Sequence, residues 1–275
     1  MTVLLQVSDP HFGTEQTTVV GALTELARQQ RPDLLVLSGD ITQRARPGQF
    51  RAARAFADRL GTPVLAVPGN HDIPLFALWE RLRHPYAHYT AAFGTDLEPT
   101  YRTPELLVVG VNTTRAWRHK DGEVSRRQID RVAELLEGAG TGQLRVVVVH
   151  QPIAVTHDED LPNRLHGHHA ALPRWAAAGA DLVMGGHIHL PYVMALQGLT
   201  RPMWAVQAGT AVSTRVRPGV PNSVNLLRWS TAATLGTCQI EQWDFSAESR
   251  AFVLAKVTEV RPARARQMAR AAPHR

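Results

Sequence analysis

Short apolar runs alternate with helical patterns over the first part of the chain. Runs at 3–7, 34–37 and 64–67 predict strands, and apolar residues at helical spacing predict helices at 19–30 and 50–60. Each strand run is continuously apolar, which is typical of strands buried on both faces. Strands separated by helices favour parallel pairing with right-handed crossovers. This part of the chain is therefore predicted to fold as an α/β sheet.

The pattern changes character near residue 192. Before it, we expect an irregular helical stretch at 74–93 and strands at 106–111, 144–149 and 181–184. We also expect a helix at 125–137 and a second helix whose last residues are 173–178. Ser125 is the expected N-cap of the helix at 125–137, and Gly138 follows its end. Beyond residue 192 the helical signals vanish. An antiparallel region is expected there, with strands at 192–197, 203–208, 224–229, 237–243 and 251–257.

The composition is that of a globular protein. The chain has 275 residues, of which 44% are hydrophobic and 20% charged, so it can bury a large core. No apolar run approaches the roughly 18 residues that a membrane span needs. The first apolar run stops at Ser8-Asp9 without a basic leader, so no signal peptide is expected. The single Cys238 excludes an internal disulfide, and we expect a cytoplasmic protein.

The positive charge is concentrated near the C-terminal end. Residues 256–275 hold six basic residues and one acidic residue, so they carry +5 of the formal net charge of +6. The rest of the chain is nearly neutral, which weakens any inference of nucleic-acid binding from the overall charge. We expect one domain over residues 1–260 and a basic, flexible tail over residues 261–275.

Polar clusters follow five of the predicted strands. They are Asp9-Pro10-His11, Gly39-Asp40, Gly69-Asn70-His71-Asp72, His150 and Gly186-His187-Ile188-His189. Because ligands of open α/β sheets bind beyond the carboxyl ends of the strands, these side chains are expected to meet at one edge. Imidazole and carboxylate together suit divalent first-row metals. Seven candidate ligands are too many for one tetrahedral ion, but they suffice for two ions that share a bridging carboxylate.

This ordered set of motifs, which spans residues 9 to 189, resembles the calcineurin-like metallophosphoesterase superfamily. Within it, the chain is similar to the class III cyclic nucleotide phosphodiesterases and their glycerophosphodiesterase relatives. The resemblance implies a four-layer α/β/β/α sandwich and two divalent metal ions, with Mn, Fe and Zn all compatible with the ligands. It implies ligand roles for seven residues: Asp9, His11 and His189 at the first metal, Asn70, His150 and His187 at the second, and Asp40 as the bridge.

The same resemblance implies how catalysis proceeds. Two cations about 3.5–4 Å apart would clamp a phosphoryl group and activate the water between them as a metal-bridging hydroxide. His71 would not bind metal, but would protonate or stabilise the leaving alkoxide. Asp72 would either orient His71 or cap the helix that follows. We therefore take His71 and Asp72 as the candidate catalytic residues.

Candidate substrate-binding residues are less specific. They are Asn70 and His71 beside the metals, His168 in a histidine-rich loop at 165–169, and Arg215, Arg217 and Asn222 around a turn at 218–221. Cations and amides in such a turn are suited to an anion, but a solvated hairpin has the same composition. Trp117 and His119 offer a further surface on which a base could stack.

The function expected from these residues is hydrolysis of a small phosphodiester, with 3′,5′-cyclic nucleotides the leading class. A nuclease or a broad-specificity phosphomonoesterase is the alternative within enzymes. Nucleic acid is less favoured as a partner, because polymer binding needs several cationic contacts to phosphates. A metal-free scaffold protein is the alternative outside enzymes, although no motif is missing. The sequence is also compatible with a homodimer.

Overall fold

The computed structural model describes residues 1–230 and 236–263. Twelve strands form two six-stranded sheets in this part of the chain. The first sheet has the order β12 (Ala251–Val260), β11 (Cys238–Ser246), β10 (Ser223–Trp229), β1 (Thr2–Val7), β2 (Leu34–Ser38) and β3 (Val64–Val67). The second has the order β4 (Thr100–Arg102), β5 (Leu106–Gly110), β6 (Leu144–Val148), β7 (Leu182–Gly185), β9 (Trp204–Gln207) and β8 (Tyr192–Ala195).

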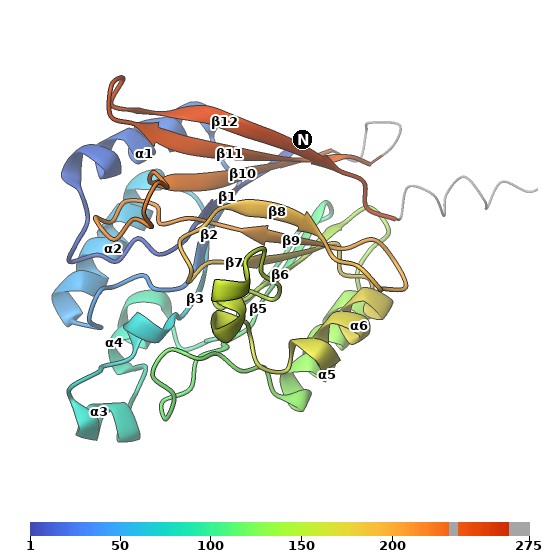
Figure 1. Ribbon diagram of the computed structural model, residues 1–275, viewed down its shortest axis with the longest axis horizontal. Helices are drawn as coiled ribbons and strands as arrows, with labels where there is room; N and C mark the ends of the chain where they lie inside the picture. The colour runs from blue at the N-terminus through green and yellow to red at the C-terminus, as the bar shows by residue number, and fades with distance from the viewer. Residues whose placement is uncertain (231–235, 264–275) are drawn as a thin grey trace, which may run out of the picture.

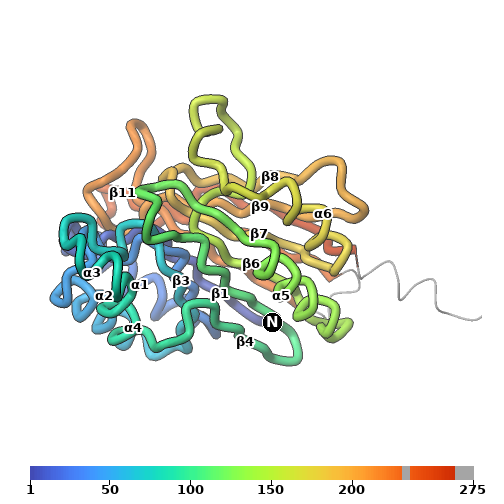
Figure 2. Tube along the Cα trace, turned by 90° about the horizontal axis from the view of Figure 1, so that it is seen from below, coloured from blue at the N-terminus to red at the C-terminus, as the bar shows by residue number. Residues whose placement is uncertain are grey.

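Helices cover the outer face of each sheet (Figure 1). They are α1 (Thr17–Gln30), α2 (Pro47–Leu60) and α4 (Ala87–Phe93) on one side and α5 (Arg126–Glu137) and α6 (His168–Ala178) on the other, while the short α3 (Leu78–Arg83) lies away from the sheets. Figure 2 shows these two groups at opposite ends of the molecule. The layers are therefore helix, sheet, sheet and helix, and the predicted four-layer α/β/β/α sandwich is confirmed.

Three apolar clusters fill the spaces between these layers. One lies between α1, α2 and the first sheet, where Leu23 and Phe50 are buried. Another lies between α5, α6 and the second sheet, around Trp175. The third joins the two sheets face to face, with Val36 and Val146 fully buried. Strands with apolar groups on both faces are required by this stacking, which explains their continuous apolar runs.

The helix ends follow the signals in the sequence. The hydroxyl of Ser125 accepts a hydrogen bond from the backbone N–H of Gln128, whose side chain in turn accepts from the Ser125 N–H at 3.0 Å. This reciprocal cap starts α5 where expected. Pro47 stands in the first turn of α2, where its missing N–H costs nothing, so that helix begins three residues before the predicted start.

Several local predictions are wrong. The region beyond residue 192 is not wholly antiparallel, because β9 pairs in parallel with β7 and so extends the second sheet. The other pairings among these strands are antiparallel as expected, β8 with β9 in the second sheet and β10, β11 and β12 with one another in the first. The short edge strand β4 was not predicted. The histidine-rich stretch is not all loop either, since His168 and His169 form the first turn of α6.

The described part of the predicted tail is short. Strand β12 ends at Val260, where the domain was expected to end. Residues 264–275 of the predicted tail lie outside the described residues, so the tail remains an expectation. Among the described residues, no helix is long and apolar enough to cross a bilayer.

Gly69 allows two loops to touch at the edge of the first sheet. A Cβ at this position would lie 2.0 Å from the backbone nitrogen of Asp40. We therefore predict that Gly69→Ala lowers the free energy of unfolding by about 1–3 kcal/mol, as overpacking does elsewhere. The free energy of unfolding is measured by urea denaturation, monitored by circular dichroism.

Gly21→Ala is the matched control, because a Cβ in the middle of α1 would meet nothing within 4 Å. That variant should gain up to about 1 kcal/mol from helix propensity. A Gly69→Ala protein with an unchanged urea midpoint would contradict the assignment of this glycine to a close approach.

Candidate metal centre

The candidate ligands follow the carboxyl ends of neighbouring parallel strands. In the first sheet, β1, β2 and β3 lead into Asp9 and His11, Asp40, and Asn70. In the second sheet, the parallel strands β6 and β7 lead into the three remaining residues, His150, His187 and His189. The sheets are stacked, so the five strand ends lie at one edge of the sandwich. The structure thus brings together all seven residues that the sequence predicted as ligands.

Asp9, His11 and His189 form the first group. Their ligand atoms lie within 4.8 Å of one another. Nε2 of His189 is 3.3 Å from Oδ1 of Asp9 and 3.2 Å from Nε2 of His11. Ligand atoms about 2.1 Å from one ion lie roughly 3–3.5 Å from each other, so this group has the spacing of a metal site.

Asp40, His150 and His187 form the second group, again within 4.8 Å. Nε2 of His150 lies 3.3 Å from Oδ1 of Asp40 and 3.2 Å from Oδ1 of Asn70. The other oxygen of Asp40 is 3.9 Å from Nε2 of His11. Asp40 therefore stands between the two groups, with one oxygen directed to each.

The backbone at these positions is strained. Eight non-glycine residues have positive φ among the described residues, and five of them are candidate ligands: Asp9, His11, Asp40, His187 and His189. Side chains with a Cβ rarely adopt this conformation, and it concentrates at functional sites. The turns are fixed by backbone bonds such as Asp9 N–H to Gly39 O at 3.1 Å and His11 N–H to Asp40 O at 3.1 Å.

Two histidines are oriented by backbone carbonyls. Nδ1 of His150 lies 3.0 Å from the carbonyl oxygen of Ser38, and Nδ1 of His189 lies 2.6 Å from that of Arg215. A carbonyl only accepts, so each Nδ1 carries the hydrogen and each Nε2 presents its lone pair to a carboxylate. Acceptors that face each other in this way need a cation between them. The donor set therefore fits two metal ions.

The electrostatics of the metal-free chain agree with this geometry. Burial alone would lower the pKa of His150, but the charge of Asp40 and its hydrogen bond outweigh burial and raise the pKa to about 9. In the absence of a metal, a proton thus takes the place between these groups. Burial lowers the pKa of His11 and of His187 to about 3, which keeps both rings neutral and able to coordinate.

The carboxylates stay ionised in spite of their burial. Burial would raise the pKa of Asp9, yet the neighbouring His189 and His150 hold it at about 2. Burial would raise the pKa of Asp40 too, but the neighbouring histidines, His150 above all, hold it well below its usual range. The amide of His187 also donates to Asp9, at 2.9 Å, and that of His71 to Asp40, at 2.7 Å. Both carboxylates are therefore ready to bind cations.

His71 is positioned by Gln43 and Arg215. Its Nδ1 donates to the carbonyl oxygen of Gln43 at 3.0 Å, and Nη1 of Arg215 donates to its Nε2 at 3.0 Å. The ring also lies edge-on against His11, with centroids 4.9 Å apart. An atom of His71 comes within 4.8 Å of His11 and Asp40 ligand atoms, so coordination by His71 is an alternative that experiment must separate.

Asp72 does not orient the ring of His71. Its buried carboxylate accepts hydrogen bonds from the backbone of Ile41 at 3.0 Å, Thr42 at 2.8 Å and Gly69 at 2.9 Å. It therefore ties the loop after β2 to the loop after β3, and the orienting contact predicted for Asp72 is made by Gln43 instead. No sequence pattern could predict this contact, because His71 is bound by the backbone carbonyl of Gln43 and not by its side chain.

A cleft of about 490 Å³ opens beside the candidate ligands. Arg215 and Arg217 line it, together with His119, Lys120 and Asn163. Nη1 of Arg217 is bonded to both carboxylate oxygens of Asp160 at 3.0 Å, and its other nitrogen to Glu159. These acids belong to a short helix at Asp158–Asn163, which Arg217 ties to the cleft wall. Sequence patterns did not predict Lys120, Asp160 and Asn163 as cleft residues, because no motif marks the loop after β5 or this short helix.

Two predicted substrate residues lie away from this cleft. The buried amide of Asn222 donates to the carbonyl oxygens of Ser213 at 2.8 Å and Thr210 at 3.3 Å, so it supports the loop that leads to Arg215. His168 is also buried, and its Nδ1 bonds to the carbonyl oxygen of Leu165 at 2.7 Å at the start of α6. Trp117 is exposed, and only its neighbour His119 lines the cleft.

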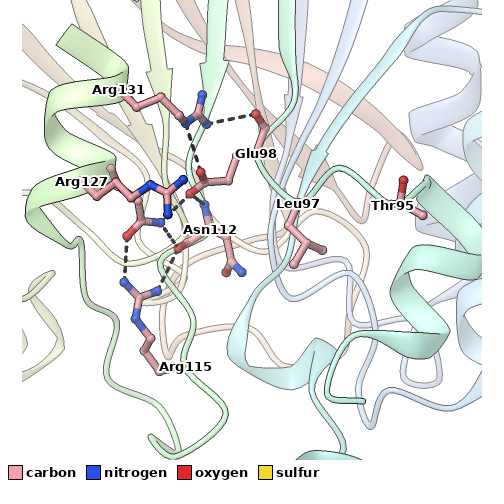
Figure 3. Close-up of a pocket in the computed structure, with 8 residues that line it drawn as sticks. Thr95, Leu97, Glu98, Asn112, Arg115, Arg127 and Arg131 are labelled. Carbon is pink, nitrogen blue, oxygen red and sulfur yellow. Dashed lines mark hydrogen bonds and ion pairs between the residues drawn. The ribbon is translucent and has the colours of Figure 1, made fainter. Parts of the chain in front are cut away.

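A second cavity, of about 510 Å³, lies at the start of α5 (Figure 3). Its polar groups bond to one another: Arg131 to Glu98 at 3.1 Å, Arg115 to Gln128 at 2.8 Å, and Gln128 to the backbone of Asn112 at 2.7 Å. This network holds both ends of the loop between β5 and α5. His119 and Lys120, which line the cleft, belong to that loop. The hydrogen bonds around this cavity therefore support the wall of the cleft.

Comparisons with known proteins agree with this geometry. The family model of calcineurin-like phosphoesterases matches residues 2–191. A probable cyclic nucleotide phosphodiesterase of Synechococcus sp. is 27% identical over 220 residues, 72% of this chain and 76% of that protein. A cAMP/cGMP dual specificity phosphodiesterase of Mycobacterium tuberculosis is 28% identical over 208 residues, 68% of this chain and 61% of that protein.

The fold has a solved counterpart as well. The crystal structure of a dimetal phosphatase from Danio rerio superposes with a TM-score of 0.65 at 14% identity, and the match covers 95% of this chain and 99% of that one. At this identity the likeness shows the fold alone. The family match, by contrast, covers every strand-end motif described above. The chain therefore belongs to the calcineurin-like phosphoesterase family and is a metal-dependent phosphoester hydrolase.

Proposed function

We propose that this chain is a binuclear phosphodiesterase for small anionic diesters, with 3′,5′-cyclic nucleotides the leading substrate class. The observation that carries the proposal is the position of Asp40, whose two oxygens are directed to two separate groups of candidate ligands. The names of both relatives, each a phosphodiesterase of cyclic nucleotides, support the substrate class. The imidazole and carboxylate ligands suit Mn, Fe or Zn.

In this proposal Asp9, His11 and His189 hold one ion. Asn70, His150 and His187 hold the other, and Asp40 bridges both. Metal ions so placed would polarise a phosphoryl oxygen and supply an activated water. The carbonyls of Ser38 and Arg215 fix the two histidines in the form that coordinates through Nε2.

The leaving group would meet His71 and Arg215. Their nitrogens lie 3.0 Å apart at the mouth of the cleft, where the departing oxygen of a diester needs hydrogen-bond donors. Gln43 restrains both, because its carbonyl binds His71 and its side-chain oxygen accepts from Nη1 of Arg215 at 3.1 Å. Arg215 thus offers a donor here, whereas His71 would donate to the departing oxygen only with a proton on Nε2, the nitrogen that accepts from Arg215 in this structure.

The cleft suits a small substrate better than a polymer. A nucleic acid needs a row of cations along its phosphates. Here the charge of Arg217 is already neutralised by Asp160 and Glu159. That leaves Lys120 and Arg215 as the cations of the cleft, which is enough for one phosphate and a neighbouring polar group. The cleft therefore favours a small diester over single-stranded DNA.

We predict the order of substrates in a screen of the metal-reconstituted enzyme. The value of kcat/KM should be highest for a cyclic nucleotide or another small diester, and at least about tenfold lower for monoesters and for single-stranded DNA. The measurement is product formation at fixed Mn²⁺ or Zn²⁺. A clear preference for a monoester or for DNA would refute the proposed substrate class.

Asp40→Ala tests the bridge. Because Asp40 contributes to both groups, we expect bound metal to fall from about two ions per chain and hydrolysis to drop to background, while the far-ultraviolet circular dichroism is unchanged. Asp58→Ala, which removes an exposed carboxylate paired with Arg54, serves as the control and should keep both ions. Two bound ions and wild-type turnover in Asp40→Ala would disprove the binuclear assignment.

His71→Ala separates a leaving-group role from coordination. A general acid typically contributes about 10²–10⁴-fold, and it matters most when the leaving group is a strong base. The variant should therefore keep both metals and lose far more activity on a cyclic or alkyl diester than on a nitrophenyl ester. Comparison of kcat for the two substrates, with metal analysis, measures this.

His84→Ala, in an exposed position outside the cleft, is the control for this comparison. Equal losses on both esters with the metals retained would place His71 in phosphoryl binding. Loss of one ion would make His71 a ligand, as its distance to His11 and Asp40 permits.

A further inference from the structure

The segment at 155–164, between β6 and α6, is held without apolar packing. It contains the short helix at Asp158–Asn163. All of its residues are described, and Asp160 alone is buried, with a side chain that is 5% exposed, whereas Leu161 is 45% exposed. In Figure 2 the segment, drawn in yellow-green, projects from the body of the fold. A buried carboxylate therefore takes the place that an apolar anchor has elsewhere in the molecule.

The partner of this carboxylate is Arg217. Its Nη1 donates to both oxygens of Asp160 at 3.0 Å, and its other terminal nitrogen donates to Glu159. Among the described residues, no other hydrogen bond or ion pair joins the 155–164 segment to the rest of the chain. Nη1 also lies 3.4 Å from the carbonyl oxygen of Ile188, which stands between two candidate ligands. Arg217 thus connects the segment to the metal edge.

The two ends of the segment are anchored independently of Arg217. Just before it, the carbonyl oxygen of Ala154 accepts from the hydroxyl of Tyr192 at 2.5 Å. Just after it, the N–H of Leu165 donates to the carbonyl oxygen of Pro152 at 2.9 Å. The position of the middle of the segment therefore depends on the ion pair, while its ends and the metal ligands do not.

The middle of the segment forms part of the cleft. Asp160 and Asn163 line the cleft beside the candidate ligands, and its volume of about 490 Å³ is that of a pocket for one small molecule. We propose that the ion pair of Arg217 with Asp160 holds the 155–164 segment against the cleft and so limits substrates to diesters whose non-reacting group is no larger than a nucleoside. This inference rests on the proposed function, because it concerns the substrate of the same site.

The burial of the pair explains why it can act as a fixed wall. The side chain of Arg217 is 21% exposed, so both charges are largely withdrawn from water. Removal of either partner leaves the other as a charge without compensation, which is unfavourable away from water. The segment would then move outward and bring the remaining charge to solvent, and the cleft would widen at this side.

Substitutions of the two partners separate this role from simple attraction. Arg217→Gln removes a cation from the cleft and Asp160→Ala removes an anion, but each breaks the same ion pair. If only the charge of the cleft mattered, a polyanion would bind less well to the first variant and better to the second. If the ion pair holds the segment, both variants should accept larger substrates.

The experiment compares three diesters of nitrophenyl phosphate whose second ester is methyl, thymidine or oligothymidylate, with the metal-reconstituted full chain. Their common leaving group keeps the chemical step alike, so the ratio of kcat/KM values reports the fit of the non-reacting group. Both variants should raise the ratio of the oligothymidylate ester to the methyl ester by at least about tenfold. Arg174→Gln, which breaks an exposed ion pair with Glu137, is the control and should leave this ratio unchanged.

Trypsin provides a readout that does not depend on turnover. Arg164 is a cleavage site at the end of the segment, and cutting there should be faster in both variants than in the wild type, because trypsin cuts locally opened chain. Arg217→Lys, which keeps the charge but loses the planar fork that binds a carboxylate through two oxygens, should be intermediate in both assays. Metal analysis and circular dichroism check that each variant is folded and loaded.

The outcomes distinguish this inference from the function on which it rests. An unchanged ratio of the two esters in the folded variants, or ratio changes of opposite sign in Arg217→Gln and Asp160→Ala, would overturn the inference and leave the diesterase function standing. A wild-type enzyme that hydrolyses none of the three diesters would refute the proposed function, and this inference with it.

Discussion

Hydrogen-bond acceptors that converge without protons between them are the feature on which the site depends. Two backbone carbonyls take the Nδ1 hydrogens of His150 and His189, so their Nε2 lone pairs face the carboxylates of Asp40 and Asp9. Such an arrangement repels itself unless a proton or a cation lies at its centre. The charge of Asp40 raises the pKa of His150, so a proton would take that place in the metal-free chain, and a bound metal ion would displace it.

The fold is arranged to hold these acceptors together. Parallel strands from two stacked sheets end at one edge, each followed by at least one candidate ligand, and five of the seven candidate ligands have positive φ. Gly69 lets one turn approach another, and the buried carboxylate of Asp72 ties the same two turns through their backbone N–H groups. The large apolar core between the sheets balances the strain that these turns store.

Much of this could be predicted from the sequence, and the failures have a common cause. Apolar runs and the polar residues that follow them are local signals, so the strands, the α/β class and the metal edge were accessible. The partner of β9 is a nonlocal choice, and no pattern within residues 203–208 records it. The orientation of His71 by the carbonyl of Gln43 leaves no side-chain signal, and so Asp72 was the more obvious candidate.

The proposed metal centre requires two cations that share Asp40. Anomalous diffraction from crystals grown with Mn²⁺ tests it most directly. We expect two peaks about 3.5–4 Å apart, each within bonding distance of one oxygen of Asp40. A single peak, or a second peak bound by His71 in place of Asn70 and His150, would contradict it.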